Sequence, residues 1–160
     1  MKKTLTFLLL ILSCTFLITG CGKKEEEPKN NDNTVAVNLV QEFKKEINET
    51  KNIKKVAKKL AESDANMPAL EVADMTKADY LMGFKEQITG YKKAYVIAPT
   101  ISTIPFIAYI FESDNPTELA NTLKEQANLR WNICTEADEM QIAVVDNYVF
   151  FVMSPNNFDD

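Results

Sequence analysis

Histidine is absent from the chain, and glycine is scarce, with four in 160 residues. The first absence removes the commonest general base, the commonest zinc ligand and the usual pH switch. The second leaves no glycine-rich loop to hold a phosphate group. The serines after residue 20 lack the glycine-flanked elbow of a hydrolase nucleophile; they are Ser63, Ser102, Ser113 and Ser154. We therefore predict no catalytic residue.

Acidic side chains are plentiful but form no recognisable site. Glu136-Ala137-Asp138-Glu139 is a cluster without the glycine-punctuated loop of a calcium site, and Asp74 and Asp79 belong to no known motif. We interpret these residues as solvated, and predict no metal ligand and no cofactor. A carboxylate-dependent hydrolase stays as an alternative.

The first 20 residues have the pattern of a signal peptide. Lys2 and Lys3 precede an apolar run from Leu5 to Ile18, which is shorter than the roughly 20 residues that a membrane-spanning helix needs. The run ends in Ile18-Thr19-Gly20-Cys21, which resembles the lipobox of bacterial lipoproteins. The resemblance implies a diacylglycerol on the Cys21 sulfur, cleavage before that residue, and a location on the extracytoplasmic side of the bacterial cell membrane. Two or three acyl chains are enough for stable anchoring.

The chain that remains after cleavage is acidic and cannot form an internal disulfide. Residues 21–160 hold 16 Lys and Arg against 23 Asp and Glu, a net charge of −7. This balance argues against nucleic acid and anionic headgroups as partners. Cys14 leaves with the signal and Cys21 is acylated, so Cys134 is the only remaining thiol.

The mature chain divides into a tether and one domain. Residues 21–34 hold the lipidated cysteine and a polar, aliphatic-free stretch, which we predict to be a disordered tether. From residue 35 to 62, apolar residues at spacings of three and four predict two short amphipathic helices, with a turn near residues 48–52. A single helix that frays there is the alternative.

Strand patterns dominate the middle of the chain. Residues 69–73 suit a short strand or an extended segment, and residues 77–84 suit a short helix. Residues 94–98 and 104–111 predict two strands around a turn at Pro99-Thr100. The second strand is apolar at both parities, which indicates that both of its faces are covered or that it is central in its sheet.

Asn115-Pro116-Thr117-Glu118 predicts the start of a helix that continues to residue 134. Its apolar stripe contains Leu119, Leu123, Ala127, Trp131 and Cys134. We interpret Cys134 as a core residue, because no histidine is present to activate its thiol. Residues 141–153 then predict a hairpin that turns at Asp146-Asn147.

Residues 91–154 resemble a domain that is found in bacterial lipoproteins, the domain of unknown function 4358. The similarity lies in the extended segment from Tyr91 to Pro99, in Phe106–Phe111, in Arg130-Trp131 after a helix, and in Glu139–Phe151. Asn147 stands where a glycine is expected in the last turn. The resemblance implies no activity, because none is established for the family.

Together these patterns predict an α+β domain over residues 35–160, with helices packed on at least one face of a mainly antiparallel sheet. The sheet has four strands in two hairpins that flank the helix at 116–134, in an order left open. The function that fits best is a non-catalytic, lipid-anchored binding or interaction module at the cell envelope. Its partners are the membrane, through Cys21, and an envelope protein; the alternative to this module, besides the hydrolase, is a small-ligand-binding protein. Tyr80, Tyr91 and Trp131 are the candidate exposed aromatic residues.

Overall fold

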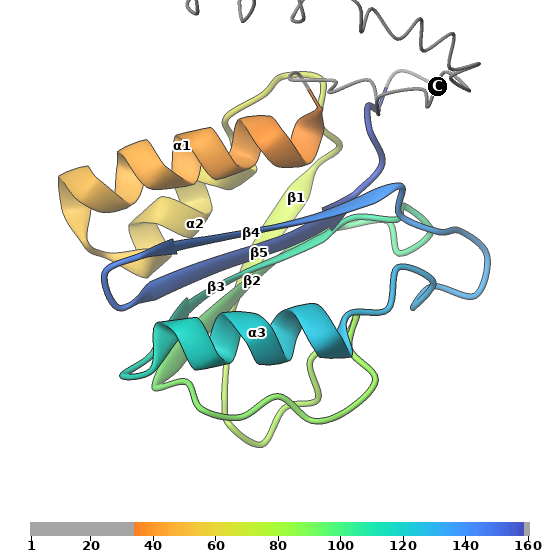
Figure 1. Cartoon of the computed structure of the whole chain (residues 1–160). Helices are drawn as coiled ribbons and strands as arrows, with labels where there is room; N and C mark the ends of the chain where they lie inside the picture. The colour runs from red at the N-terminus through yellow and green to blue at the C-terminus, as the bar shows by residue number, and fades with distance from the viewer. Residues whose placement is uncertain (1–33, 159–160) are drawn as a thin grey trace, which may run out of the picture. The chain divides into compact units, whose positions relative to one another are not determined.

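The computed structural model describes residues 34–158, which lie in one compact unit. The signal peptide, Cys21 and the tether up to residue 33 therefore lie outside the described residues. The elements in chain order (Figure 1) are α1 (Val35–Thr50), α2 (Ile53–Ala61), β1 (Leu70–Met75), β2 (Lys93–Pro99), β3 (Ile107–Glu112), α3 (Pro116–Gln126), β4 (Glu139–Val145) and β5 (Tyr148–Ser154).

The strands form one antiparallel sheet in the order β1-β2-β3-β5-β4. The α+β class and the two hairpins flanking α3 are confirmed. The prediction of four strands is wrong, because the stretch near residue 70 pairs along β2 from Leu70↔Pro99 to Met75↔Ala94. It is a half-buried strand at the edge of the sheet, so its apolar pattern is weaker than that of the central strands.

Two apolar clusters hold the sheet between its covering layers. On one face α1 packs over β4 and β5, and α2 packs over β1, β2 and β3; on the other, α3 packs over β4 and β5. Alternate residues of β3 enter the two clusters, with Ala108 and Ile110 in one and Ile107, Tyr109 and Phe111 in the other. The prediction that this strand is central and covered on both faces is confirmed.

The stretch from residue 35 to 62 forms two helices, which decides between the two alternatives. The Thr34 hydroxyl accepts a hydrogen bond from Val37 N at 3.4 Å and caps α1, while Asn52 Oδ1 accepts from Lys55 N at 3.1 Å and caps α2. Between them Lys51 adopts a left-handed backbone with φ of 52°, and its N–H bonds to Ile47 O. That conformation ends α1, so one continuous helix cannot form.

The helix predicted over residues 77–84 is wrong, because this stretch consists of turns. Gly83 has φ of +92°, outside the helical region, and Asn128 N donates to its carbonyl at 2.9 Å. Buried side chains from the irregular segment 76–92 join the cluster under α3 and cover the rest of that face; they are Leu81, Phe84, Ile88 and Tyr91.

Helix α3 begins as predicted, with Pro116 in its first turn, but ends at Gln126 rather than 134. Ala127 takes an extended backbone and forms an antiparallel bridge with Phe84, which draws the chain out of the helix. Cys134 therefore lies in a loop and is exposed, so its assignment to the core is wrong. The Asn115 side chain makes no capping bond; the Ser113 hydroxyl accepts from Asn115 N at 3.0 Å instead.

The predicted hairpin at Asp146-Asn147 is confirmed, with Val145 paired to Tyr148 across the turn. Asp146 has φ of 51°, whereas Asn147 is not among the described residues with positive φ. Since the second turn position keeps an ordinary backbone, it does not require the glycine that the family resemblance led us to expect.

Candidate functional site: an apolar surface at one end of the sheet

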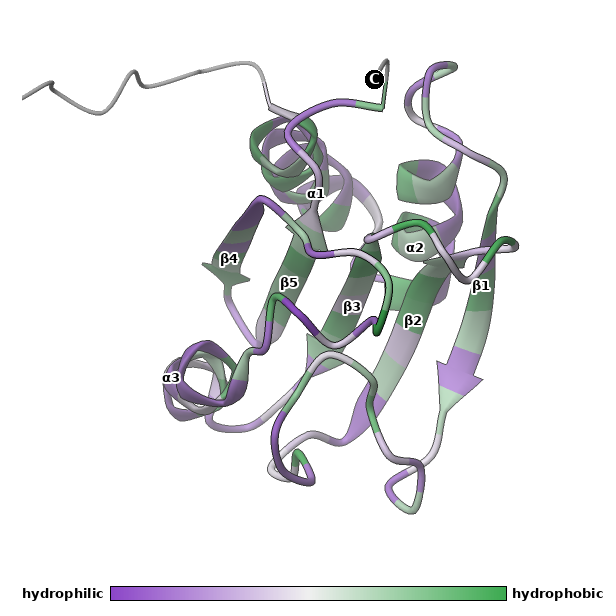
Figure 2. Ribbon diagram, turned by 90° about the vertical axis from the view of Figure 1, so that its right-hand side faces the viewer, coloured by the Kyte–Doolittle hydropathy of each residue, from purple (hydrophilic) through white to green (hydrophobic). Residues whose placement is uncertain are grey.

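Several of the longer loops that connect helices and strands lie at one end of the sheet. Strands β2 and β5 end there, and β1, β3 and β4 begin there, as the pairs Leu70↔Pro99 and Glu139↔Ser154 show. The loops 100–106 and 127–138 and the segment 155–158 therefore lie at this end, which we call the loop end. Figure 2 looks onto it.

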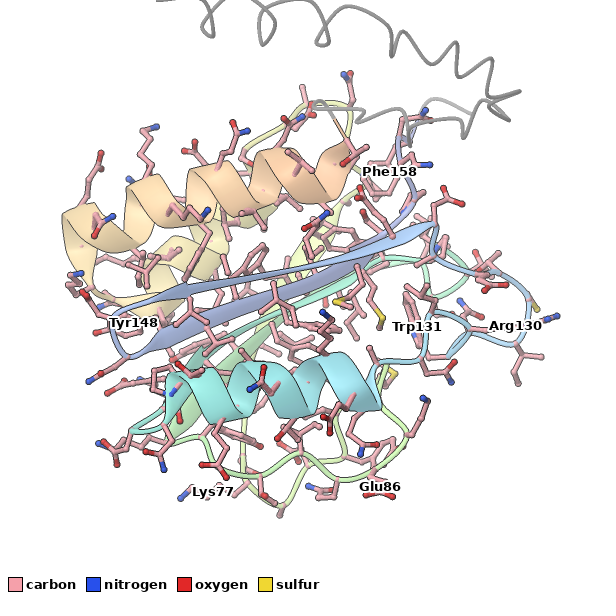
Figure 3. All side chains as sticks on the ribbon, viewed as in Figure 1. Lys77, Glu86, Arg130, Trp131, Tyr148 and Phe158 are labelled. Atoms are coloured by element: carbon pink, nitrogen blue, oxygen red, sulfur yellow. The ribbon has the colours of Figure 1, made fainter. Side chains whose placement is uncertain are left out.

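Large apolar side chains are exposed at the loop end. Ile133 is 94% exposed, Ile101 61% and Met82 55%. Met82, Trp131 and Ile133 line a cavity of about 300 Å³, and Pro99 and Ser102, which flank the loop segment of Ile101, line it too. We call Met82, Ile101, Trp131 and Ile133 the apolar surface. Trp131 is half-buried and lies beside Arg130 at this end (Figure 3).

Hydrogen bonds between the loops fix the apolar surface in place. Asn132 Nδ2 donates to Ser102 O at 2.7 Å, and Thr135 Oγ1 donates to Thr103 O at 2.9 Å. Within the second loop, Ala137 N donates to Leu129 O at 3.0 Å. These bonds therefore hold in place the loops that carry the exposed apolar side chains. Such exposure is typical of a contact surface.

The cavity beside the apolar surface has a largely apolar lining. Hydrocarbon, an indole ring, and hydroxyl and amide groups line it, without a carboxylate or an amine. Apolar walls with a few polar groups suit a partner that brings its own apolar surface.

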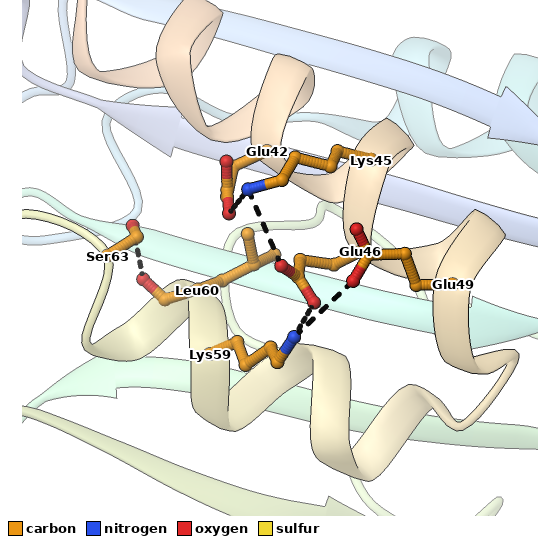
Figure 4. Close-up of polar contacts among 7 residues, drawn as sticks. All are labelled: Glu42, Lys45, Glu46, Glu49, Lys59, Leu60 and Ser63. Carbon is orange, nitrogen blue, oxygen red and sulfur yellow. Dashed lines mark hydrogen bonds and ion pairs between the residues drawn. The ribbon is translucent and has the colours of Figure 1, made fainter.

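A second cluster, of charged residues, joins α1 to α2 (Figure 4). Lys59 pairs with Glu46, and lies 3.8 Å from Glu49. Lys45 Nζ lies 3.1 Å from a Glu42 oxygen and 3.8 Å from a Glu46 oxygen. The Glu46 side chain is only 5% exposed, although it borders a cavity of about 480 Å³. Its carboxylate is thus held between two lysines.

The hydrogen bond between Lys59 and Glu46 stabilises the charged forms of both groups. The hydrogen bond from Lys59 lowers the pKa of Glu46 despite the opposing effect of burial, and the same bond raises the pKa of Lys59. A catalytic general acid needs a carboxyl pKa that is raised, and a nucleophilic lysine needs one that is lowered. The two shifts run the other way, and the ion pairs of Lys59 with Glu46 and Glu49 join α2 to α1, so we call the cluster a clamp between the helices.

Three of the other carboxylates singled out from the sequence accept local hydrogen bonds, whereas Glu139 has a buried oxygen, Oε1, without a partner among the described residues, so its interpretation as solvated is wrong. Asp79 Oδ2 accepts from Thr76 N at 2.6 Å, Asp74 Oδ2 accepts from the Tyr95 hydroxyl at 3.4 Å, and Asp138 Oδ2 accepts from Asn156 N at 2.9 Å. Folding does not bring Asp74 or Asp79 near Asp138 in a shared pocket. Within residues 34–158 no three side chains of metal-ligand type gather at one point.

The aromatic candidates separate in the structure. Tyr80 is exposed, Tyr91 is buried, and Trp131 lies in the apolar surface. Sequence reasoning missed Met82, Ile101 and Ile133. The sequence offered only a weak signal for these residues. Ile101 and Ile133 lie among turn-forming neighbours, and no periodicity assigns them to a core.

Comparison with known proteins adds no relative: no family model, curated protein or solved structure matches the chain. The similarity of residues 91–154 to the domain of unknown function 4358 therefore stays a prediction. None of the helices in the described part of the chain is long and apolar enough to span a bilayer.

Proposed function

We propose that the chain is a lipid-anchored lipoprotein on the extracytoplasmic side of a bacterial cell membrane, where its domain acts as a non-catalytic binding module. The sequence around Cys21 supports the anchor, and the resemblance to the lipoprotein domain of unknown function 4358 belongs to the same proposal. The observation that carries the binding role is the apolar surface of Met82, Ile101, Trp131 and Ile133.

The size of the apolar effect supports a binding role. Burying one Ile or Met side chain stabilises a complex by about 1.5–3 kcal/mol. Three largely exposed side chains of this kind, next to a half-buried tryptophan, offer enough for a specific but weak contact. A lipid anchor confines the domain to the envelope, where a weak contact is populated because the partner is always near.

A small-ligand-binding protein is the second candidate, because of the cavity of about 480 Å³ beside α1 and α2. Its walls include Glu42, Glu46, Lys59 and Asp64, so a ligand there would be polar and charged. The hydrolase alternative gains no support from this cavity. The pKa of Glu46 is lowered, which keeps that carboxyl from serving as a general acid at neutral pH.

The test separates the anchor from the contact surface. Intact cells that express the wild type, Cys21→Ala, Ile133→Asp or Val144→Asp are crosslinked, fractionated and examined by mass spectrometry. We expect the wild type in the membrane fraction with reproducible crosslinks to phospholipid or to an envelope protein, and Cys21→Ala either released or unprocessed. Ile133→Asp stays in the membrane fraction but loses crosslinks. Val144, which is 41% exposed on β4, is the matched control.

Two results would count against the proposal. If Cys21→Ala fractionates like the wild type, the anchor is wrong and the localisation fails with it. If Ile133→Asp keeps every wild-type crosslink, as the control Val144→Asp should, the apolar surface is not the contact surface.

A further inference from the structure

We propose that the apolar surface docks onto the phospholipid bilayer that holds the acyl chains of Cys21, so that the domain lies against the membrane with its loop end inward. This inference rests on the proposed lipid anchor and names what the contact surface binds. The anchor alone requires no such contact, because it needs only the acylated cysteine.

The first support is the place where the tether joins the domain. Thr34 caps α1 at the loop end, and the next residue, Val35, donates its N–H to Asn156 O at 3.1 Å. Asn156 N in turn donates to Asp138 Oδ2 at 2.9 Å. Asp138 belongs to the same loop as Trp131 and Ile133, so α1 begins at the end of the sheet that carries the apolar surface.

The second support is the length of chain between Cys21 and α1. The 13 residues from Gly22 to Thr34 span at most about 45 Å when fully extended. The loop end is thus confined to a shell above the bilayer that is comparable in depth to the domain itself, whose radius of gyration is about 14 Å for its length. Confinement of this kind gives an effective concentration in the millimolar range, which is enough to populate a weak contact.

The third support is the chemistry of the side chains. Tryptophan prefers the boundary between headgroups and acyl chains, since its ring is apolar and its N–H seeks a polar partner. Ile101, Ile133 and Met82 present hydrocarbon that can enter the acyl region beside it. The indole of Trp131 suits the boundary with the acyl chains, and the guanidinium of Arg130, next to it in the chain, suits the headgroup layer.

The charge of the loops distinguishes an electrostatic contact with the bilayer from an apolar one. The loops 100–106 and 127–138 together hold one cation, Arg130, against Glu136 and Asp138. These two loops therefore carry a net charge of −1, and the connection that leads into β1 at the same end adds Glu62 and Asp64. Attraction to anionic headgroups cannot drive the contact, and burial of apolar side chains must do so.

Trp131 is the sole tryptophan of the chain, so its fluorescence reports on this surface alone. The lipidated full-length protein is incorporated into phosphatidylcholine vesicles with or without bromine-labelled acyl chains, since bromine quenches a tryptophan that touches it. We expect an emission shift to the blue relative to unlipidated Cys21→Ala, and at least a twofold loss of emission in the brominated vesicles.

Two variants and a control sharpen the measurement. Ile101→Asp and Ile133→Asp place a charge in the contact, and we expect each to remove at least half of the quenching while the protein still floats with the vesicles. Val144→Asp makes the same change at the opposite end of the sheet and should quench like the wild type. All three positions are exposed, so thermal unfolding should confirm that each variant is folded.

Failure of this inference can be told apart from failure of the anchor. If the lipidated wild type floats with the vesicles but is not quenched, the anchor stands and the bilayer contact is overturned; crosslinking through residue 133 to a protein or to a second copy would then identify the occupant. Quenching that needs anionic lipid and disappears in salt also overturns it. If the wild type does not float at all, the anchor proposal fails and this inference fails with it.

Discussion

The two faces of the sheet are covered in different ways. On one face α1 and α2 pack with capped ends and regular apolar spacing. On the other, α3 covers β4 and β5 only, and the irregular segment 76–92 covers the remainder. Figure 1 shows the helical pair on one side and α3 with the irregular chain on the other.

Part of a sheet can be covered without a helix if the backbone of the covering segment finds other hydrogen-bond partners. In segment 76–92 those partners are side chains and distant backbone groups. The Tyr109 hydroxyl donates to Met82 O at 2.9 Å, and Lys85 N donates to Gln126 O at 2.9 Å. A helix forms such bonds within itself, so the irregular cover should be more sensitive to changes in single partners.

The largest expected effect comes from removing one buried ring from each cover. Phe43 of α1 stacks on Phe150 with ring centroids 5.1 Å apart, and Phe84 lies 4.8 Å from the ring of Phe151. We expect Phe43→Ala and Phe84→Ala each to lower the free energy of unfolding by about 3–5 kcal/mol. Denaturant unfolding measures both. A loss below about 1 kcal/mol for Phe84→Ala would mean that the irregular cover contributes little.

The next effect comes from the backbone of the irregular segment. At Gly83, φ is +92° and an added Cβ would lie 2.5 Å from Met153 Cε; at Gly90, φ is +87° and the space is open. Gly83→Ala should cost about 2–4 kcal/mol from strain and overpacking, and Gly90→Ala about 1–2 kcal/mol from strain alone. Equal losses in thermal unfolding would show that Met153 moves aside freely.

A smaller effect is expected from the hydroxyl that holds the segment to the sheet. Burial raises the pKa of Tyr109, so its hydroxyl stays protonated and donates to Met82 O at neutral pH. Tyr109→Phe leaves that carbonyl without its donor and should cost about 1–3 kcal/mol. Tyr80→Phe removes a bond to Phe84 O from an exposed side chain, and should cost less. If Tyr80→Phe lowered the free energy of unfolding more than Tyr109→Phe, the hydrogen bond of Tyr80 would be the more important one for holding the segment.

The difference between the faces also explains how much of the fold could be predicted. Periodicity identified α1 and α2, and a run that is apolar at both parities identified the central strand β3. Periodicity failed after Gln126, where Trp131 and Cys134 continue the helical spacing by coincidence. The bridge between Ala127 and Phe84 ends the helix, and a contact between residues 43 positions apart leaves no local pattern.

The candidate site was less predictable than the fold, for the same reason. Trp131 was recognised as a candidate exposed aromatic residue, but the loops that carry Ile101 and Ile133 are joined by the hydrogen bonds from Asn132 to Ser102 and from Thr135 to Thr103. Taken alone, each isoleucine is a single apolar residue in a loop, and nothing in its sequence neighbours predicts that it is exposed. Their exposure depends on the whole end of the sheet, which sequence spacing does not encode.

The smallest expected effect lies on the helical face, in the clamp between α1 and α2. The pKa of Glu46 is lowered from its ordinary 4.5 by the hydrogen bond from Lys59. A carboxyl with a lowered folded pKa stabilises the fold above its unfolded pKa, and this contribution is lost as the pH falls through the folded value. Glu46→Gln should therefore unfold at a slightly lower temperature than the wild type at pH 7, with a difference that shrinks below about pH 4.5.

Salt provides the control for this last prediction, because Lys59 is half exposed and its pairing should weaken as ionic strength rises. Glu49→Gln is the matched variant, since its carboxylate lies on the same face, 3.8 Å from Lys59, but is exposed. We expect it to change the unfolding temperature less than Glu46→Gln at every pH. A difference between Glu46→Gln and wild type that grows toward low pH would reverse the sign, and would mean that the clamp does not hold Glu46 ionised. The helical face would then depend on apolar packing alone, in contrast to the irregular face with its buried hydroxyl.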